Sequence, residues 1–356
     1  MSFIIHYNKH SYTANEFTQL PLNHEYAINA SDFIKQWIYD LPFAFLSSGS
    51  TGEPKSFQFK KEQLQSGAQL TIDALGLRNK NQHILLCLNP KFVGGAMMLA
   101  RAFELDCEIT LLEPNIKIIE LLEPDHSYTF ASFVPAQLLS PGFDTNKFNR
   151  FKHVLIGGAH VSRALEMQLE HVAPQCYHTY GMTETLSHVA LRRIGTENAF
   201  KLLPQTELKI NEAGCICIKT VFNSAWVNTH DMAELLNDGS FKILGRTDFV
   251  INSGAYKIHP EQIEKVIEEL NENEKFIHGD FIISSMKDIV WGEKCVCVVS
   301  QKTDEKQFQK LQELLSQKLM KYQIPREMVH LNTWKFTENG KTNRKAIKEL
   351  IDNQSI

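Results

Sequence analysis

One stretch of the chain is rich in hydroxyl groups and glycine and ends in a lysine, which suits phosphate binding. Hydroxyls and backbone N–H groups can surround phosphate oxygens, glycine lets the backbone approach them, and lysine adds positive charge. The apolar residues 43–46 before it are typical of a buried strand, and helix-forming residues follow from Lys61. We therefore predict a strand-to-helix loop of the kind that holds phosphates. Its candidate ligands are Ser47, Ser48, Gly49, Ser50, Thr51, Gly52 and Lys55.

The spacing of this stretch excludes an ordinary P-loop NTPase. That class has four residues between a glycine and a following Gly-Lys-Ser/Thr. Here Gly49 and Gly52 are separated by two residues, and Lys55 does not follow a glycine. Serine, glycine and proline are also common in turns, so a surface turn is the alternative interpretation of this stretch alone.

Three further segments carry residues that suit nucleotide chemistry. Tyr-Gly-Met-Thr-Glu-Thr begins at Tyr180, Asp231 precedes Gly-Arg-Thr-Asp at 245–248, and Asn-Gly-Lys-Thr-Asn-Arg occupies 339–344. In this order and at these distances, the motifs resemble those of the acyl-adenylate-forming (AMP-binding) superfamily of acyl-CoA ligases, adenylation domains and luciferases. The resemblance extends from about residue 43 to about residue 350. It implies an enzyme that uses ATP to form an acyl-adenylate and pyrophosphate, and then a thioester with CoA.

The resemblance also implies roles for the residues around ATP. The 47–55 loop would hold the β- and γ-phosphates and then pyrophosphate. Thr183 would contact the α-phosphate, and Glu184 would bind Mg²⁺, which takes carboxylate oxygen and few protein ligands. Tyr180 would pack against adenine, with Gly181 next to it in the same motif.

Other motif residues would serve the ribose, the hinge and the second half-reaction. Asp231 and Arg246 would hold the ribose hydroxyls, reaching from opposite sides. Asp248 matches the hinge of a mobile C-terminal lid, although Phe249 stands where the family often has a second acid. Lys341 matches the lysine that neutralises charge between the carboxylate and the α-phosphate.

A lid segment beyond the hinge resembles the lining of the pantetheine channel. The channel residues would be Gly254 and Ala255, where the family commonly has two glycines. The extra methyl group of Ala255 could narrow the channel, so the sequence supports the CoA step less directly than adenylation.

A helix-like segment at 91–101 resembles the acyl-pocket helix of o-succinylbenzoate–CoA ligases of menaquinone synthesis. Those enzymes usually have histidine where this chain has Phe92, and they carry an arginine at the position of Arg101. A cation on an apolar helix is costly unless it is paired, and the second carboxylate of a dicarboxylate substrate would be such a partner. The alternative is a pair within the protein, with Glu104, Asp106 or another acid.

The pattern of apolar segments predicts an α/β fold. Strands are expected at 83–88, 107–112, 128–134 and 153–156, alternating with helices at 92–103, 116–122 and 164–171. This alternation indicates a mostly parallel sheet covered on both faces, and ligands of such sheets bind beyond the carboxyl ends of the strands. The turn formed by Gly157, Gly158 and Ala159 is expected there, in one site with the 47–55 loop.

The last third of the chain changes character. Strands at 208–210, 215–219 and 241–244 suggest a small sheet that closes the large domain. Beyond it we expect helices at 260–270 and 305–319, strands at 276–284 and 294–299, and a helix from 343, which is an α+β unit of domain size. The predicted domains are therefore 1–247, which binds nucleotide and acid, and 248–356, the lid.

Composition excludes several classes. The net charge of −4 is spread over mixed acidic and basic residues, which argues against nucleic acid as a main partner. Without a signal peptide or an apolar run of membrane-spanning length, we expect a cytoplasmic protein that is not inserted in a membrane. A homodimer is one assembly open to it. The seven cysteines include Cys-x-Cys pairs at 215 and 295, which we interpret as core thiols rather than a zinc site.

The phosphate-type loop begins at Ser47, much earlier than in most members of the family that the chain resembles, so the resemblance predicts a short form that lacks most of the N-terminal subdomain. The chain is then a minimal ligase or a degenerate homologue that binds nucleotide without turnover. A broader aryl- or acyl-CoA ligase and a stand-alone enzyme that loads a carrier protein are further alternatives.

Overall fold

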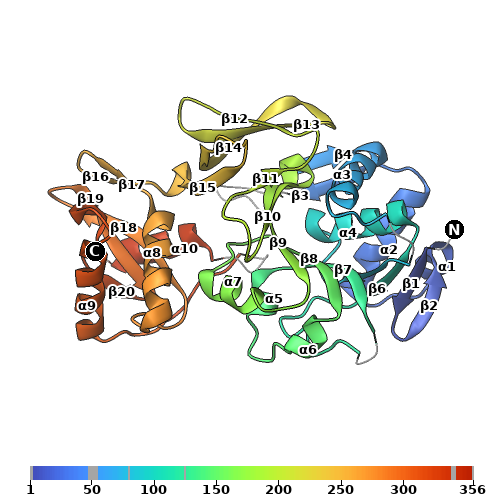
Figure 1. Cartoon of the computed structure of the whole chain (residues 1–356), viewed down its shortest axis with the longest axis horizontal. Helices are drawn as coiled ribbons and strands as arrows, with labels where there is room; N and C mark the ends of the chain where they lie inside the picture. Colours follow the sequence, from blue (N-terminus) through green and yellow to red (C-terminus); the bar gives the residue numbers. More distant parts are fainter. Residues whose placement is uncertain (1–2, 47–54, 79–80, 124–125, 338–341, 355–356) are drawn as a thin grey trace.

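The computed structural model describes residues 3–46, 55–78, 81–123, 126–337 and 342–354 (Figure 1). Its largest element is a nine-stranded sheet in the order β11-β10-β9-β8-β7-β5-β6-β1-β2. The six central strands from β9 to β1 are parallel to their neighbours, whereas β10, β11 and β2 are antiparallel additions at the two ends. The strands are β1 (Ile4–Tyr7), β2 (His10–Thr13), β5 (His83–Leu86), β6 (Glu108–Leu111), β7 (Tyr128–Phe133), β8 (Phe151–Ile156), β9 (Gln175–Met182), β10 (Ser187–Arg193) and β11 (Lys201–Leu202). The predicted mostly parallel sheet is confirmed.

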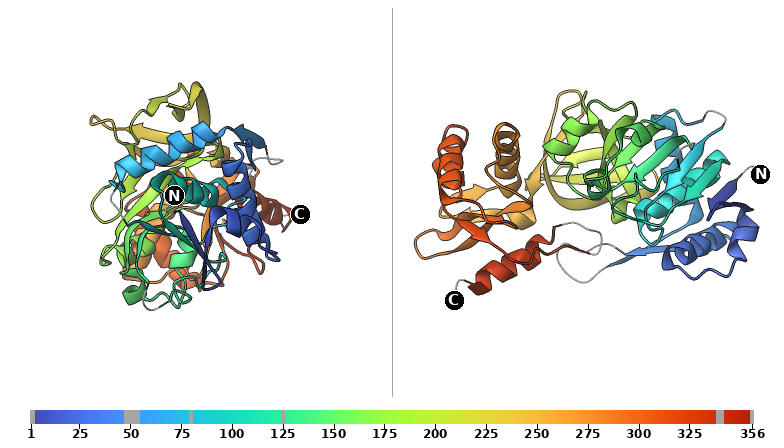
Figure 2. Two further views of the ribbon diagram at one scale, coloured as in Figure 1. Left: turned by 90° about the vertical axis from the view of Figure 1, so that its right-hand side faces the viewer. Right: turned by 90° about the horizontal axis from the view of Figure 1, so that it is seen from below.

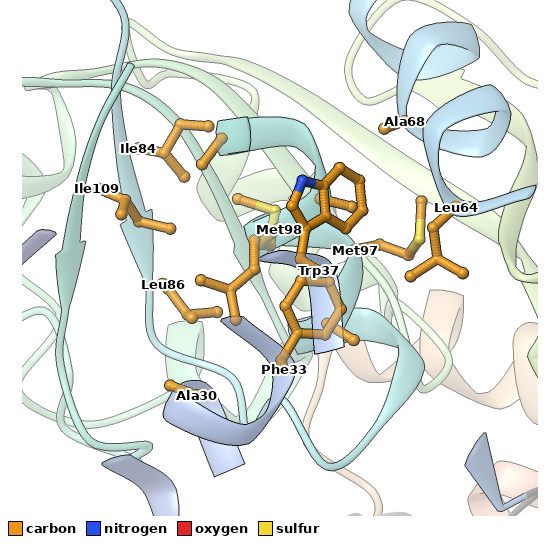
Figure 3. Close-up of a cluster of buried hydrophobic side chains, with 14 of the residues drawn as sticks. Ala30, Phe33, Trp37, Leu64, Ala68, Ile84, Leu86, Met97, Met98 and Ile109 are labelled. Carbon is orange, nitrogen blue, oxygen red and sulfur yellow. The ribbon is translucent and has the colours of Figure 1, made fainter. Parts of the chain in front are cut away.

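Helices cover both faces of this sheet, as predicted for an α/β fold. One face packs against α2 (Glu25–Ile38), α3 (Lys61–Ala74) and α4 (Val93–Leu105). The other packs against α5 (Pro135–Leu138), α6 (Thr145–Phe148) and α7 (Arg163–Leu169). Successive residues of β5 point to opposite faces of the sheet. Ile84 and Leu86 pack in the first layer, against α2, α3 and α4, and Leu85 packs in the second layer, against α5, α6 and α7. Figure 3 shows the first layer, where Trp37 and Phe33 of α2 meet Met97 and Met98 of α4.

The helix predicted at 116–122 is wrong, because these residues form turns. Prolines at 114 and 124 limit the segment, and a helix of so few residues has little to offset its nucleation cost. Its apolar residues Ile118, Ile119 and Leu122 are nevertheless buried in the second layer. The apolar pattern of this segment therefore predicted correctly that its residues are buried, and incorrectly that they form a helix.

The segment before the phosphate-type loop is part of the main sheet and its first layer. Strand β1 pairs in parallel with β6 at the sheet edge, and α1 (Ala14–Thr18) follows β2. In α2, the Tyr26 hydroxyl donates to the Leu86 carbonyl oxygen at 2.7 Å. The short lead thus packs against the large sheet rather than standing apart.

Strands β3 (Phe43–Leu46) and β4 (Ser56–Phe59) form a separate antiparallel hairpin. This corrects the expectation that a helix follows the first strand directly, because β4 pairs with β3 before α3 begins. Phe43 and Phe45 are buried while Ala44 and Leu46 are exposed, so β3 is half-buried. Alternating burial is the pattern of a hairpin strand with one face on the core.

A four-stranded antiparallel sheet follows, in the order β12-β13-β14-β15. Its strands are β12 (Glu207–Ile210), β13 (Cys215–Thr220), β14 (Asn223–Leu235) and β15 (Phe241–Arg246). The sequence pattern did not predict strand β14. The register shifts on both its borders, and bulges of this kind break the two-residue alternation that marks a strand.

The C-terminal elements build a five-stranded sheet of their own (Figure 1 and Figure 2). They are β16 (Ile251–Ser253), β17 (Tyr256–Ile258), α8 (Pro260–Asn273), β18 (Phe281–Asp288), β19 (Gly292–Val299), α9 (Glu305–Ser316), β20 (Met328–His330) and α10 (Arg344–Gln354). Two hydrophobic clusters here contain only residues from Ile251 onward. The short 3₁₀ turn Thr247–Phe249 lies between the two sheets. The division at residues 247 and 248 stays a prediction.

Two composition-based expectations concern cysteines and membranes. All seven cysteines are buried and free, which agrees with core thiols. None of the helices in the described part of the chain combines the length and apolar character needed to cross a membrane.

Candidate active site

The glycine turn after β8 lies at the carboxyl end of the parallel sheet. A Cβ atom at Gly157 would lie 2.1 Å from Thr179 Oγ1 on β9. Gly158 has φ +81°, a left-handed conformation that favours glycine. Local geometry therefore favours glycine at both positions. The pairing of Ile156 with His178 puts the 157–159 turn beside Thr179 of β9, at the carboxyl end of β8 as predicted.

The Tyr-Gly-Met-Thr-Glu-Thr motif forms the end of β9 and a tight turn into β10. A Cβ atom at Gly181 would lie 2.2 Å from the Ser187 carbonyl oxygen. Leu186 and Ser187 both have positive φ, at 48° and 96°. Residues held in such unfavourable backbone conformations are concentrated at functional sites. The turn carries Thr183 and Glu184 at its tip.

Glu184 faces a recess of ≈390 Å³ next to the β3–β4 hairpin. Its other lining residues are Phe57, Gln58, Phe59, Gln63, Phe222, Asn223 and Val227. Among the residues that the structure describes, none makes a hydrogen bond or ion pair with the Glu184 carboxylate. A carboxylate with its oxygens available suits a hard cation such as Mg²⁺. Lys55 is exposed immediately before β4, while residues 47–54 lie outside the described part of the chain.

Tyr180, Asp231 and Arg246 form one hydrogen-bonded group. The Tyr180 hydroxyl donates to Asp231 Oδ2 at 2.8 Å, and Arg246 Nη1 donates to Asp231 Oδ1 at 2.8 Å. Asp231 and Arg246 are cross-strand partners on β14 and β15. They therefore contact each other directly, which corrects the expectation that they reach the site from opposite sides.

The charges of this group shift the pKa values of its members. Burial raises the pKa of Tyr180, and the Asp231 carboxylate raises it further. Burial alone would lower the pKa of Arg246, but Asp231 and Asp248 outweigh it and raise the value. The arrangement keeps an arginine cation and a neutral phenol at the end of the antiparallel sheet.

Asp248 belongs to the same group, and the residue after it contacts the C-terminal helix α10. The Asp248 carboxylate accepts from Arg246 Nη2 at 2.6 Å and lies 2.9 Å from His230 Nδ1. The next residue, Phe249, has the Arg246 guanidinium 5.9 Å from its ring centroid and the Arg344 guanidinium at 5.2 Å. Phe249, where the family often has an acid, thus lies between two arginines, one on each side of the proposed hinge.

The predicted channel residues form the turn between β16 and β17. Gly254 has φ +61°, and its N–H donates to the Trp291 carbonyl oxygen at 2.7 Å. A Cβ atom there would lie 3.0 Å from Trp291 Cε3. Gly254 and Ala255 are exposed on the C-terminal sheet. Lys341 lies outside the described residues, three positions before Arg344 of α10.

Arg101 is buried on α4, with 1% of its surface exposed. Its Nη2 donates to Thr71 Oγ1 at 3.2 Å, its Nη1 contacts Met98 Sδ at 3.6 Å, and its guanidinium lies 5.9 Å from the Phe130 ring centroid. Burial lowers its pKa to about 9. No carboxylate of the described residues forms an ion pair with Arg101.

The alternative partners of Arg101 are engaged elsewhere. The Glu104 carboxylate accepts from Gln65 and Gln69, and Asp106 Oδ1 accepts from the Phe3 N–H. The structure therefore shows no ion pair between Arg101 and either Glu104 or Asp106. Phe92 caps the start of α4, about 13 Å along the helix axis from Arg101 at 1.5 Å per residue, so the two predicted acid-site residues are not in contact.

Sequence reasoning missed two polar neighbours of Arg101. Thr71 of α3 is fully buried, and its Oγ1 lies 3.0 Å from Nε2 of His188 on β10. Burial and the nearby charge of Arg101 hold the pKa of His188 well below its ordinary value. Thr71 interrupts the buried stripe of its helix, and His188 follows the Thr183–Thr185 turn by three residues. Both positions can be seen in the sequence, but neither indicates that its side chain lies beside Arg101.

A larger hollow of ≈580 Å³ at the β2–α1 corner is lined by Ser11, Tyr12, Asn15, Glu16, Gln19 and Leu20. It contains none of the predicted site residues.

Comparison with known proteins identifies relatives of this chain. The family model described as "AMP-binding enzyme" matches residues 25–220. A 2-succinylbenzoate–CoA ligase of Listeria monocytogenes serotype 4b is 29% identical over 334 residues, covering 85% of this chain and 68% of the relative. The enzyme of the same name from Lactococcus lactis is 25% identical over 324 residues, covering 85% and 69%.

Solved structures give the same architecture. An acyl-CoA synthetase (AMP-forming)/AMP-acid ligase II-like protein from Dyadobacter fermentans is 31% identical, with a TM-score of 0.61 over 96% of this chain and 99% of that one. The o-succinylbenzoate CoA synthetase of Bacillus subtilis, in complex with the acyl-adenylate intermediate, has a TM-score of 0.74. It is 21% identical, and the match covers 86% of this chain and 68% of the Bacillus protein. At that identity the match supports the fold alone.

Proposed function

Because this chain belongs to the AMP-binding enzyme family, we propose that it is an AMP-forming ligase that joins o-succinylbenzoate to CoA for menaquinone synthesis, in the cytoplasm. In the first half-reaction, a substrate carboxylate oxygen attacks the α-phosphorus of ATP, and the bond to the bridging oxygen breaks to release pyrophosphate. In the second, the sulfur of CoA attacks the acyl carbon, and AMP leaves. Relatives with this name support the substrate.

The observation that carries the substrate assignment is the environment of Arg101. A buried charge without an ionic partner is costly, and none of the described acids supplies one. Arg101 belongs to the helix that resembles the acyl pocket, and Thr71 and His188 connect it to β10, the strand that follows Glu184. The second carboxylate of o-succinylbenzoate would provide the missing negative charge. A monocarboxylate would not.

The nucleotide end of the site would work mainly by positioning and charge neutralisation. Thr183 would contact the α-phosphate, the 47–55 loop and the 157–159 turn would hold the other phosphates, and Tyr180 would pack on adenine. Asp231 and Arg246, already paired, would present an acceptor and donors to the ribose from one side. Glu184 would hold Mg²⁺, which supplies positive charge to the phosphates when bound.

The lid would supply different residues to the two half-reactions. Lys341 would neutralise charge at the α-phosphate during adenylation. Rotation about Asp248 would then replace it with Gly254 and Ala255, which would line the pantetheine channel. The position of Asp248 between the β12–β15 sheet and the C-terminal sheet along the chain supports a hinge there.

The test is pyrophosphate release across a panel of carboxylates, each with and without CoA. We expect Mg²⁺-dependent release with o-succinylbenzoate, little with benzoate, and o-succinylbenzoyl-CoA only when CoA is added. Formation of ADP and orthophosphate would reject adenylation. Equal rates with benzoate would keep adenylation and reject the dicarboxylate, and the absence of any turnover would favour a degenerate homologue.

A further inference from the structure

Three neighbouring strands bring two histidines and a glutamate together on one face of the large sheet. His6 lies on β1, His83 opens β5 and Glu108 opens β6, with β6 between the other two. Glu108 is directly opposite His83, and His6 is opposite Thr110, two residues further on. Because side chains two residues apart share a face of a strand, all three residues project on the same side.

Their ligand atoms form a compact set. One nitrogen or carboxylate oxygen from each lies within 4.8 Å of the other two. His6 Nε2 is 3.0 Å from Glu108 Oε2, and the two imidazole ring centroids are 5.4 Å apart. A tetrahedral ion with bonds of about 2.0–2.2 Å needs ligand atoms roughly 3.3 Å apart. The exposed fractions of the His6 and Glu108 side chains, 30% and 54%, leave room for this contraction.

Neighbouring hydroxyls hold both imidazoles in place. Ser11 Oγ lies 2.9 Å from His6 Nδ1, on the side of the ring away from the Nε2 that meets Glu108. Thr110 Oγ1 lies 2.8 Å from His83 Nε2. A hydrogen bond to the second nitrogen is how proteins orient imidazoles that bind metals, and His6 has this arrangement.

We propose that His6, His83 and Glu108 form a binding site for Zn²⁺ or a similar divalent transition-metal ion. Two imidazoles and one carboxylate suit such an ion better than Mg²⁺, which prefers oxygen ligands only. The ion would join the β1–β2 hairpin to the central strands. The site lies at the amino ends of β5 and β6, whereas the proposed nucleotide residues follow the carboxyl ends of β8 and β9. It is therefore independent of the proposed ligase reaction.

The test uses the full chain, freed of metal with a chelator and titrated with Zn²⁺ by calorimetry in excess Mg²⁺, which occupies oxygen-only sites. We expect the wild type to bind one Zn²⁺ per chain and His6→Gln or Glu108→Gln to weaken binding at least tenfold. His10→Gln is the matched control, because His10 is an exposed histidine on the same hairpin but outside the set. It should bind as the wild type does.

Two further measurements separate a built site from scattered surface histidines. Zn²⁺ should raise the unfolding temperature of the wild type and His10→Gln but not of His6→Gln, and all three should unfold at similar temperatures in chelator. Co²⁺ in place of Zn²⁺ should give the visible absorption of a tetrahedral ion. Equal loss of binding in the His6 and His10 variants, or a wild type without stoichiometric binding or the Co²⁺ spectrum, would overturn the proposal.

Discussion

Arg101 and Thr71 are joined by a hydrogen bond, from the guanidinium Nη2 to the hydroxyl oxygen at 3.2 Å, in a part of the core closed to solvent. A threonine hydroxyl solvates a cation but does not neutralise it. Because no acid of the described residues does so either, the fold keeps a positive charge where it is costly. This relationship makes the proposed role of Arg101 in binding the acid testable.

Replacement of Arg101 by alanine should raise KM for o-succinylbenzoate far more than KM for ATP. Loss of one charge-assisted contact corresponds to roughly 1.5–3 kcal/mol, or about ten- to a hundredfold. Steady-state kinetics with each substrate varied in turn measures this. Arg193→Ala, at an exposed arginine of β10, is the control. If neither KM changes and the variant remains folded, Arg101 is structural.

Replacement of His188 should affect the same substrate more weakly. His188→Leu removes the partner of Thr71 Oγ1, and one lost hydrogen bond of about 0.5–1.5 kcal/mol predicts a two- to tenfold higher KM for the acid. His188→Gln keeps a polar group near Thr71 and should lie closer to the wild type. If both variants have the same kinetics as the wild type, His188 does not contribute to binding of the acid.

The charge of Arg101 should also be visible in the titration of His188. In the wild type, burial and Arg101 hold the pKa of His188 well below its ordinary value. In Arg101→Ala the second cause is gone, so this pKa should rise, although burial still opposes protonation. Histidine NMR signals followed between pH 7 and 4 measure the change. A His188 signal that titrates identically in both proteins would contradict the coupling.

Alanine at Gly157 should destabilise the fold through one specific contact. The new Cβ would lie 2.1 Å from Thr179 Oγ1, and overpacking of this kind costs about 1–3 kcal/mol. Thr179→Ala removes the opposing oxygen, so Gly157→Ala should cost less in that background. Urea unfolding of the four proteins gives the interaction energy. An equal cost of Gly157→Ala in both backgrounds would show that the backbone conformation, rather than Thr179, requires glycine.

Replacement of Lys341 by alanine should separate the two half-reactions. Adenylation should fall by about a hundredfold or more, because charge at the α-phosphate loses the cation proposed to reach it. Thioester formation from pre-made acyl-adenylate should be retained, since Gly254 and Ala255 would by then have replaced Lys341. A folded variant that loses both half-reactions equally would argue against a swinging lid, and normal adenylation would remove Lys341 from the mechanism.

The sequence by itself determined the elements whose apolar residues lie close together along the chain. The strands at β5, β6, β7 and β8 and the helices α4 and α7 follow runs of buried residues, and burial of such runs dominates the stability of local elements. The order of the nucleotide motifs and the cation on α4 were also visible, because each is a property of residue types and spacing alone.

The tertiary structure decided which residues meet. Residues 43–46 and 56–59 form a hairpin because β4 pairs with β3 before the chain enters α3. Asp231 contacts Arg246 through the register of two bulged strands, and Thr71 meets His188 across 117 residues of sequence. Local patterns record which face of an element is buried, but partners this distant are chosen by how whole elements pack. For that reason the sequence identified Arg101 as unusual, and only the fold showed that Thr71 and His188, rather than an acid, lie beside it.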